Sequence, residues 1–197
     1  TSVNLLICIM IYIEHQFRQL YSYFCSLANI FEEDLNQQEK EEKYEAALKI
    51  GFRQHCDILG YTRRLEKTCH VGYSAQIIMN VLLLAMIMIR LANEEKTLTT
   101  VISGALFAIT ILNTTGLYMA TLGDITLEND KLTTAMYLSG WENCTRSSSV
   151  RVRRLLSIGM SQTQNPFEIY ALGVISMSLS SYVTIVKYSY SIFSVIV

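Results

Sequence analysis

The order of hydrophobic and polar positions divides the chain into long uncharged runs separated by charged segments. Residues 71–89, 97–123 and 169–186 contain no Asp, Glu, Lys or Arg. A helix needs about 20 apolar residues, each adding ~1.5 Å, to cross the hydrocarbon core of a bilayer. The three uncharged runs therefore predict three membrane-spanning helices.

The first residues predict a fourth span. Residues 1–13 are uncharged and mainly apolar, and the apolar spacing resumes at Leu20 after Glu14, His15 and Arg18. The run lacks an initiator methionine, and it lacks the charged start and small-residue cleavage site of a signal peptide. We therefore expect the chain to be a fragment whose upstream spans are absent from the sequence.

Composition and charge support a lipid environment. Hydrophobic residues make up 51% of the chain and charged residues 17%, whereas a soluble domain carries about a quarter charged residues. The two long charged segments hold seven and five basic residues, and the short turn near residues 90–96 holds two. Because basic residues stay on the cytoplasmic side, both long segments are expected inside the cell. With a net charge of −1, we expect no nucleic-acid partner.

The charged segments are predicted to be helical. Residues 32–50 contain no Gly or Pro, which favours a long helix that continues from the first span. We expect the chain to turn near Gly51 and a second helix to lead into the next span. In the second segment, Val152, Leu155, Leu156 and Gly159 share one side of a helix that carries arginines on another. This helix either rests on anionic lipids or packs against a neighbouring subunit.

Neither a metal site nor an enzyme active site is predicted. The pairs His55-Cys56 and Cys69-His70 do not match zinc-site spacing, in which paired ligands stand two to four residues apart. The sequence has no glycine-rich phosphate loop, no nucleophile elbow and no paired carboxylates that face a common site. We expect no cofactor and no catalytic residue.

The last uncharged run contains a polar stripe. Its members recur at steps of three and four, which places them on one side of a helix: Ser176, Ser180, Thr184, Lys187, Ser191 and Ser194. An ionisable residue within a span usually faces a bundle interior or water, whereas small residues also serve tight helix packing. The stripe is therefore either a water-facing or interface wall or a packing surface.

Several segments together resemble the C-terminal half of insect odorant receptors. They are "LGDITLENDKLTTAMYLSGW" (122–141), "VRVRRLLSIGMSQTQNPFEIYALGVISMSL" (150–179), "YVTIVKYSYSIF" (182–193), "HCDILGYTRRLEKTCHVGY" (55–73) and "EHQFRQLYSYFCSLANI" (14–30). The family usually has a basic residue before Ser-Gln-x-Pro, whereas this chain reads "MSQTQNP". A gustatory-type chemoreceptor is the related alternative, but its Thr-Tyr and Gln-Phe pattern is replaced here by Ser181-Tyr182 and Tyr188-Ser189.

The resemblance implies an all-α polytopic membrane protein, of which this chain supplies the last four of seven transmembrane helices. The expected single membrane domain, residues 1–197, is then divided as follows: helix four 1–27, cytoplasmic helical loop 28–70, helix five 71–92, helix six 98–122, cytoplasmic anchor loop 123–166 and pore-lining helix seven 167–197.

The resemblance further implies an odorant-gated cation channel in the plasma membrane of sensory neuron dendrites. The chain would be a tuning subunit of a hetero-tetramer with a co-receptor, and the lipid bilayer and volatile odorants are its other partners. A non-channel transporter or scaffold is the competing class, although no internal repeat is evident.

Candidate residues follow for each role. The stripe would line the pore, with Phe193 and Val197 as an apolar gate. Odorants need apolar walls, for which the candidates are Ile9, Tyr12, Phe107 and Ile111. The cytoplasmic anchor candidates are Trp141, Arg151, Arg154 and Leu155.

Overall fold

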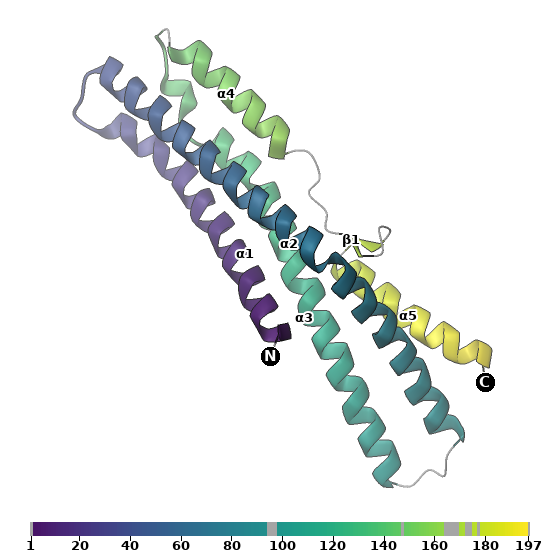
Figure 1. Ribbon diagram of the computed structural model, residues 1–197. Coiled ribbons are helices and arrows are strands. Elements are labelled where there is room, and N and C mark those ends of the chain that lie inside the picture. Colours follow the sequence, from purple (N-terminus) through teal and green to yellow (C-terminus); the bar gives the residue numbers. More distant parts are fainter. Residues whose placement is uncertain are drawn as a thin grey trace. The chain divides into compact units, whose positions relative to one another are not determined.

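The computed structural model describes residues 2–93, 98–146, 148–163, 170–171, 175–176 and 178–196 (Figure 1). These residues are almost entirely helical, which confirms the all-α prediction. The elements are α1 (Ser2–Ser26), the 3-10 helix η1 (Leu27–Glu32), α2 (Gln37–Asn93), α3 (Leu98–Tyr137), the 3-10 helix η2 (Trp141–Asn143), α4 (Ser148–Thr163), the strands β1 (Tyr170–Ala171) and β2 (Ile175–Ser176), and α5 (Leu179–Ile196).

The chain divides into two compact units. The first unit is Thr1–Leu65 with Asp124–Phe167, and the second is Glu66–Gly123 with Glu168–Val197. Helices α2 and α3 each contribute residues to both units.

In the first unit, α1, the start of α2, the end of α3 and α4 share a core. The core residues of α1 recur at helical spacing, so that Met10, Phe17, Leu20 and Phe24 lie on one side and are buried. Figure 1 shows α1 beside the first half of α2. The buried partners from the other helices include Tyr44, Leu48, Leu132, Met136, Val152 and Leu156.

The loop before α2 ends in one of the two hydrogen bonds of a capping box. Glu39 accepts a hydrogen bond from the backbone N–H of Asn36 (3.2 Å), and the carbonyl of Asn36 accepts from the N–H of Lys40 (3.0 Å). An Asn followed three residues later by Glu satisfies backbone groups that the first helical turn leaves unpaired. The chain therefore reverses at residues 33–36 and enters α2 with its end capped.

The predicted turn near Gly51 is wrong, because α2 runs through this residue without a break. A Cβ at Gly51 would lie 2.8 Å from Cε1 of Phe24. Glycine is thus needed here for the close approach of α1 to α2, and not for a change of direction.

The second unit exposes apolar side chains that a soluble protein would bury. On α2 these include Ile78, Met79, Leu82 and Met86, and on α3 they include Val101, Ile102, Leu106 and Ile109. Two segments of the described residues, His70–Arg90 and Leu98–Asn143, are long and apolar enough to cross a membrane. They overlap the predicted spans 71–92 and 98–122, while the spans 1–27 and 167–197 stay predictions.

The last helix begins later than the sequence predicts. Residues Tyr170–Ala171 and Ile175–Ser176 form an antiparallel pair of short strands, with Tyr170 opposite Ser176. Helix α5 starts at Leu179, where the hydroxyl of Ser178 accepts a hydrogen bond from the backbone N–H of Ser181 (3.3 Å). This contact is typical of an N-cap. The expected helix over 167–197 is therefore wrong in its first part.

Candidate functional site

A buried carboxylate organises the polar part of the first unit. Glu41, only 1% exposed, accepts hydrogen bonds from the backbone N–H groups of Thr145 (2.9 Å) and Arg146 (3.1 Å). It also accepts from the side-chain amide of Gln37 (3.0 Å) and from the hydroxyl of Ser148, the first residue of α4. We call these five residues the Glu41 cluster. Glu41 thereby holds the loop that leads into α4. Its negative charge also interacts favourably with the positive, N-terminal end of the α4 helix dipole.

The cluster keeps this carboxyl group ionised. Burial opposes the charge on Glu41, but the hydrogen bonds from Ser148 and Thr145 outweigh it and lower the pKa from 4.5 to about 2. Hydrogen bonds to the charged form are the physical cause. The result is a fixed negative charge at the junction of α2 and α4.

Three neighbouring contacts lie close to the junction. Glu45 pairs with Lys49 (2.7 Å) and with Arg151 of α4 (3.0 Å), and these contacts lower the pKa of Glu45. Tyr44 and Ser139 share a buried hydrogen bond of 2.6 Å, and burial raises the pKa of the Tyr44 phenol. Helices α2 and α4 are thus joined by charged as well as apolar contacts.

The predicted anchor residues all lie in the first unit. Arg151 makes the ion pair with Glu45. The indole N–H of Trp141 donates to the carbonyl of Tyr137 (3.1 Å), and the guanidinium of Arg153 lies 5.8 Å from the centre of the Trp141 ring. Arg154 is exposed and Leu155 is partly buried. Sequence reasoning missed Glu41, because nothing in the charged run distinguishes it from its neighbour Glu42.

His55 is a buried core residue. Its Nε2 lies 3.2 Å from the side-chain oxygen of Asn129, and its ring meets Phe17 edge-on at 6.5 Å. Burial lowers the pKa of His55, which favours the neutral ring. Cys56 is exposed, and the described residues contain no group of three or more His, Cys, Asp and Glu that could hold a metal ion.

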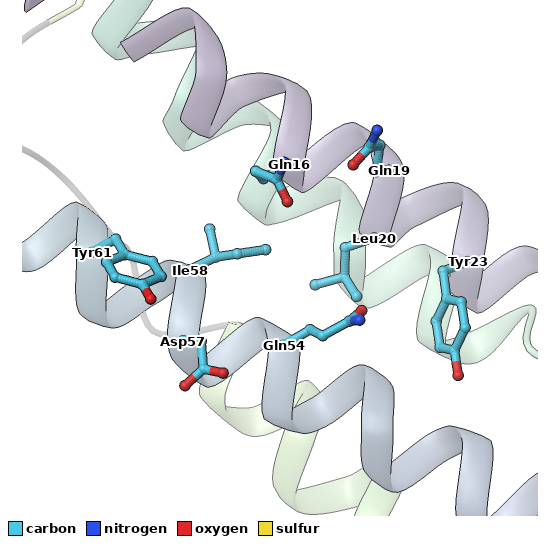
Figure 2. Close-up of a pocket in the computed structure, with 8 residues that line it drawn as sticks. All are labelled: Gln16, Gln19, Leu20, Tyr23, Gln54, Asp57, Ile58 and Tyr61. Carbon is cyan, nitrogen blue, oxygen red and sulfur yellow. The ribbon is translucent and has the colours of Figure 1, made fainter. Parts of the chain in front are cut away.

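A polar groove lies between α1 and α2 in the first unit. Its volume is about 330 Å³, and it is lined by Gln16, Gln19, Leu20 and Tyr23 of α1 and by Gln54, Asp57, Ile58 and Tyr61 of α2. Both sets follow the spacing i, i+3, i+4, i+7, which places each on one side of its helix. Figure 2 shows the two sets on facing helices. Sequence reasoning missed this groove, although the matching spacing was its signal.

The second unit contains a cavity of about 340 Å³ between the end of α2 and the start of α3. We call it the Phe107 cavity, and it is lined by Ile87, Arg90, Thr100, Ser103, Gly104 and Phe107. Of the predicted odorant residues, Phe107 therefore lines a cavity, whereas Ile111 is buried in the helix packing. Ile9 and Tyr12 lie exposed on α1 in the first unit.

Helix α5 packs through one side and exposes the other. The phenol of Tyr182 donates to the carbonyl of Leu112 (3.3 Å), its ring lies against Gly116, and Ile185 is buried. At about 100° per residue, the stripe residues on α5 lie roughly half a turn around the helix from Tyr182 and Ile185. All five are exposed: Ser180, Thr184, Lys187, Ser191 and Ser194.

Three predicted pore residues are not placed on this exposed side. Ser176 belongs to β2 and not to the helix, because α5 begins only after the Ser178 cap. Val197 and the side chain of Phe193 lie outside the described residues. The stripe that the structure describes is therefore shorter than the predicted one.

A buried polar contact joins the two long helices within the second unit. Asn80 donates to the hydroxyl of Thr115 (2.6 Å) and accepts from Gln76 (3.0 Å). We expect Asn80→Leu to lower the free energy of unfolding by about 1 kcal/mol, the usual size of such a bond between membrane helices. Thermal unfolding of the detergent-solubilised receptor measures this loss. Asn113→Leu, the same change at an exposed site of α3, should have no comparable effect, and equal losses would contradict the prediction.

A helical chain with two long apolar segments and exposed apolar helix surfaces has the features of a membrane protein. The family model described as 7tm Odorant receptor matches residues 1–190. The chain belongs to this odorant receptor family, which is not a family of enzymes. No curated protein matches it.

Proposed function

We propose that this odorant receptor acts as a subunit of a ligand-gated cation channel that it forms with a co-receptor in the plasma membrane of sensory neuron dendrites. The observation that carries the proposal is the exposed polar stripe of α5. A helix in hydrocarbon exposes apolar side chains, whereas Lys187 and its neighbours on the stripe require water or a polar partner. A wall of a water-filled pathway meets this requirement.

The other roles in the channel are proposed as follows. The Phe107 cavity supplies apolar walls for a volatile ligand. The Glu41 cluster fixes α4 within the cytoplasmic anchor, to which Trp141, Arg151, Arg154 and Leu155 belong. Phe193 and Val197 form the apolar gate at the end of the last helix, where closure excludes water.

Lys187→Leu tests the pore. A single positive charge about 10 Å from a permeating cation in water costs ~0.4 kcal/mol, so its removal should raise the cation conductance roughly twofold. Lys187→Glu should raise the conductance further and shift the reversal potential toward the equilibrium potential of the more permeant cation. Recordings of odorant-evoked current from receptor and co-receptor expressed together provide the measurement.

The control for this test is Lys67→Leu, because Lys67 is an exposed lysine of the first long charged segment. Its replacement should leave the conductance unchanged. If cation permeation is unaltered in both Lys187 variants at normal surface expression, α5 does not line the pore.

A further inference from the structure

We propose that the polar groove between α1 and α2 binds small organic ammonium ions. Its eight described lining residues include none of the predicted odorant residues, and all of them belong to the first unit. This role is therefore separate from the proposed channel function. It is carried by the charge, the hydrogen-bonding groups and the aromatic surface of the groove.

The groove carries one charge, and that charge is negative. Asp57 is the one charged residue among the eight described residues that line it. Asp57 is exposed, and it makes no hydrogen bond or ion pair with any residue that the structure describes. A carboxylate accepts hydrogen bonds and an ammonium group donates them. The groove therefore favours a cationic ligand head and disfavours an anionic one.

The basic residues next to the groove along α1 and α2 do not occupy Asp57. On α1, the guanidinium of Arg18 lies 2.6 Å from Glu14 and 3.3 Å from Glu128. On α2, Arg53 stands one turn before Asp57, but the two form no ion pair among the described residues. The carboxylate of Asp57 is therefore available to a ligand.

Three glutamines supply neutral hydrogen-bonding groups. Gln16 and Gln19 come from α1 and Gln54 comes from α2, as Figure 2 shows. None of the three makes a hydrogen bond with another described residue. Each carboxamide has an oxygen that accepts and an NH₂ group that donates, so it can turn its oxygen toward an ammonium group. The glutamines add hydrogen bonds to the ligand, while Asp57 sets the sign of its charge.

Tyr61 provides an aromatic surface one turn beyond Asp57. This tyrosine is 61% exposed, and the face of an aromatic ring attracts a cation. Leu20 and Ile58, the two aliphatic residues of the lining, are buried and form the apolar floor of the groove. The groove thus suits a ligand that joins a positive head to a small hydrocarbon body.

The size and the position of the groove limit the ligand. A volume of about 330 Å³ lies near the lower end of the range of small-molecule sites, so it fits a small amine and not a peptide. The lining residues of α2 all precede the apolar segment His70–Arg90 and belong to the charged segment that is predicted to be cytoplasmic. The ligand is therefore a soluble amine of the cytoplasm and not the headgroup of a lipid.

The preference for a cation can be measured with 2-phenylethylammonium as the probe. The receptor is solubilised in dodecyl maltoside, an uncharged detergent, and saturation-transfer difference NMR gives the dissociation constant by titration. The neutral 2-phenylethanol should bind about fivefold more weakly, as expected for the loss of one charge pair about 4 Å apart in water. The anionic phenylacetate should bind more weakly still. Equal binding of the three probes would overturn the proposal.

Matched variants locate the binding of 2-phenylethylammonium. Asp57→Asn should weaken it about fivefold, and Asp57→Glu should preserve it because the charge remains. Tyr61→Leu should weaken it roughly two- to fivefold, and Tyr61→Phe should not, since the aromatic face is kept. The control is Asp34→Asn, the same change at an exposed aspartate outside the groove. Binding that is unchanged in Asp57→Asn, or equally weakened in Asp34→Asn, would overturn the proposal.

A lipid supplement separates the two sources of an ammonium group. Phosphatidylethanolamine added to the micelles should leave the dissociation constant of 2-phenylethylammonium unchanged. If this lipid displaces the probe from the receptor but not from Asp57→Asn, the groove holds a lipid headgroup and the proposed soluble ligand is wrong. The binding assay requires no current, so its result stands apart from the channel proposal.

Discussion

Replacement of Glu41 by Ala is expected to lower the free energy of unfolding by about 3 kcal/mol, since several hydrogen-bond donors lose their shared charged acceptor. The backbone N–H groups of Thr145 and Arg146 and the hydroxyl of Ser148 would lose their common partner. Because 1 kcal/mol corresponds to roughly 2–4 °C in a chain of this size, the unfolding temperature of the solubilised receptor should fall by roughly 6–12 °C.

The neighbouring residue provides the control for this change. Glu42 is exposed and contacts Gln38 at 3.0 Å. Glu42→Ala should change the stability by no more than about 0.5 kcal/mol, as surface substitutions do. If both alanine variants unfold at the same temperature, Glu41 does not organise the junction.

The same cluster predicts a dependence on pH. The folded-state pKa of Glu41, about 2, lies below its ordinary value of 4.5, so the folded state binds fewer protons than the unfolded state. The stability that this shift contributes, on the order of 3 kcal/mol, is present above pH 4.5 and is lost as the pH falls toward 2. Glu41→Gln should remove this part of the pH dependence, and an unchanged acid profile would contradict the assignment.

Gly140→Ala is the second substitution with a large expected effect. Gly140 has a φ of 86°, which costs a residue with a side chain about 1 kcal/mol. An added Cβ would also lie 2.9 Å from the backbone Cα of Ala28, which cannot rotate away. Together these terms should lower the free energy of unfolding by about 3 kcal/mol, measured as a lower unfolding temperature and lower surface expression.

Gly60→Ala is the matched control. No atom lies within 4 Å of a Cβ placed at Gly60, and the residue is inside α2. Alanine has the higher helix propensity, so this variant should be neutral or more stable by up to about 1 kcal/mol. A loss as large as that of Gly140→Ala would show that any added methyl group is harmful.

Features with a strong local pattern could be predicted from the sequence. The uncharged runs predicted the apolar parts of α2 and α3, because a helix surrounded by lipid needs a long apolar stretch whichever helices it packs against. The helix of residues 148–163 was also predictable, and Val152, Leu156 and Gly159 of its apolar side are buried.

Features that depend on distant partners could not be predicted. Gly51 looks like a turn until Phe24 is placed against it. Glu41 and Glu42 are indistinguishable in a charged run, and only the loop around residue 145 makes one of them buried. The start of α5 was missed because an apolar run fits a strand as well as a helix.

The long sequence separation within the Glu41 cluster has a consequence for synthesis. Glu41 leaves the ribosome 104 residues before Thr145 and 107 before Ser148. Its binding partners therefore become available only after the segments His70–Arg90 and Leu98–Asn143 have been translated. Of the four partners that Glu41 has in the folded chain, only Gln37 has been synthesised before then, so the junction is expected to close late in biogenesis, after the apolar segments have been translated.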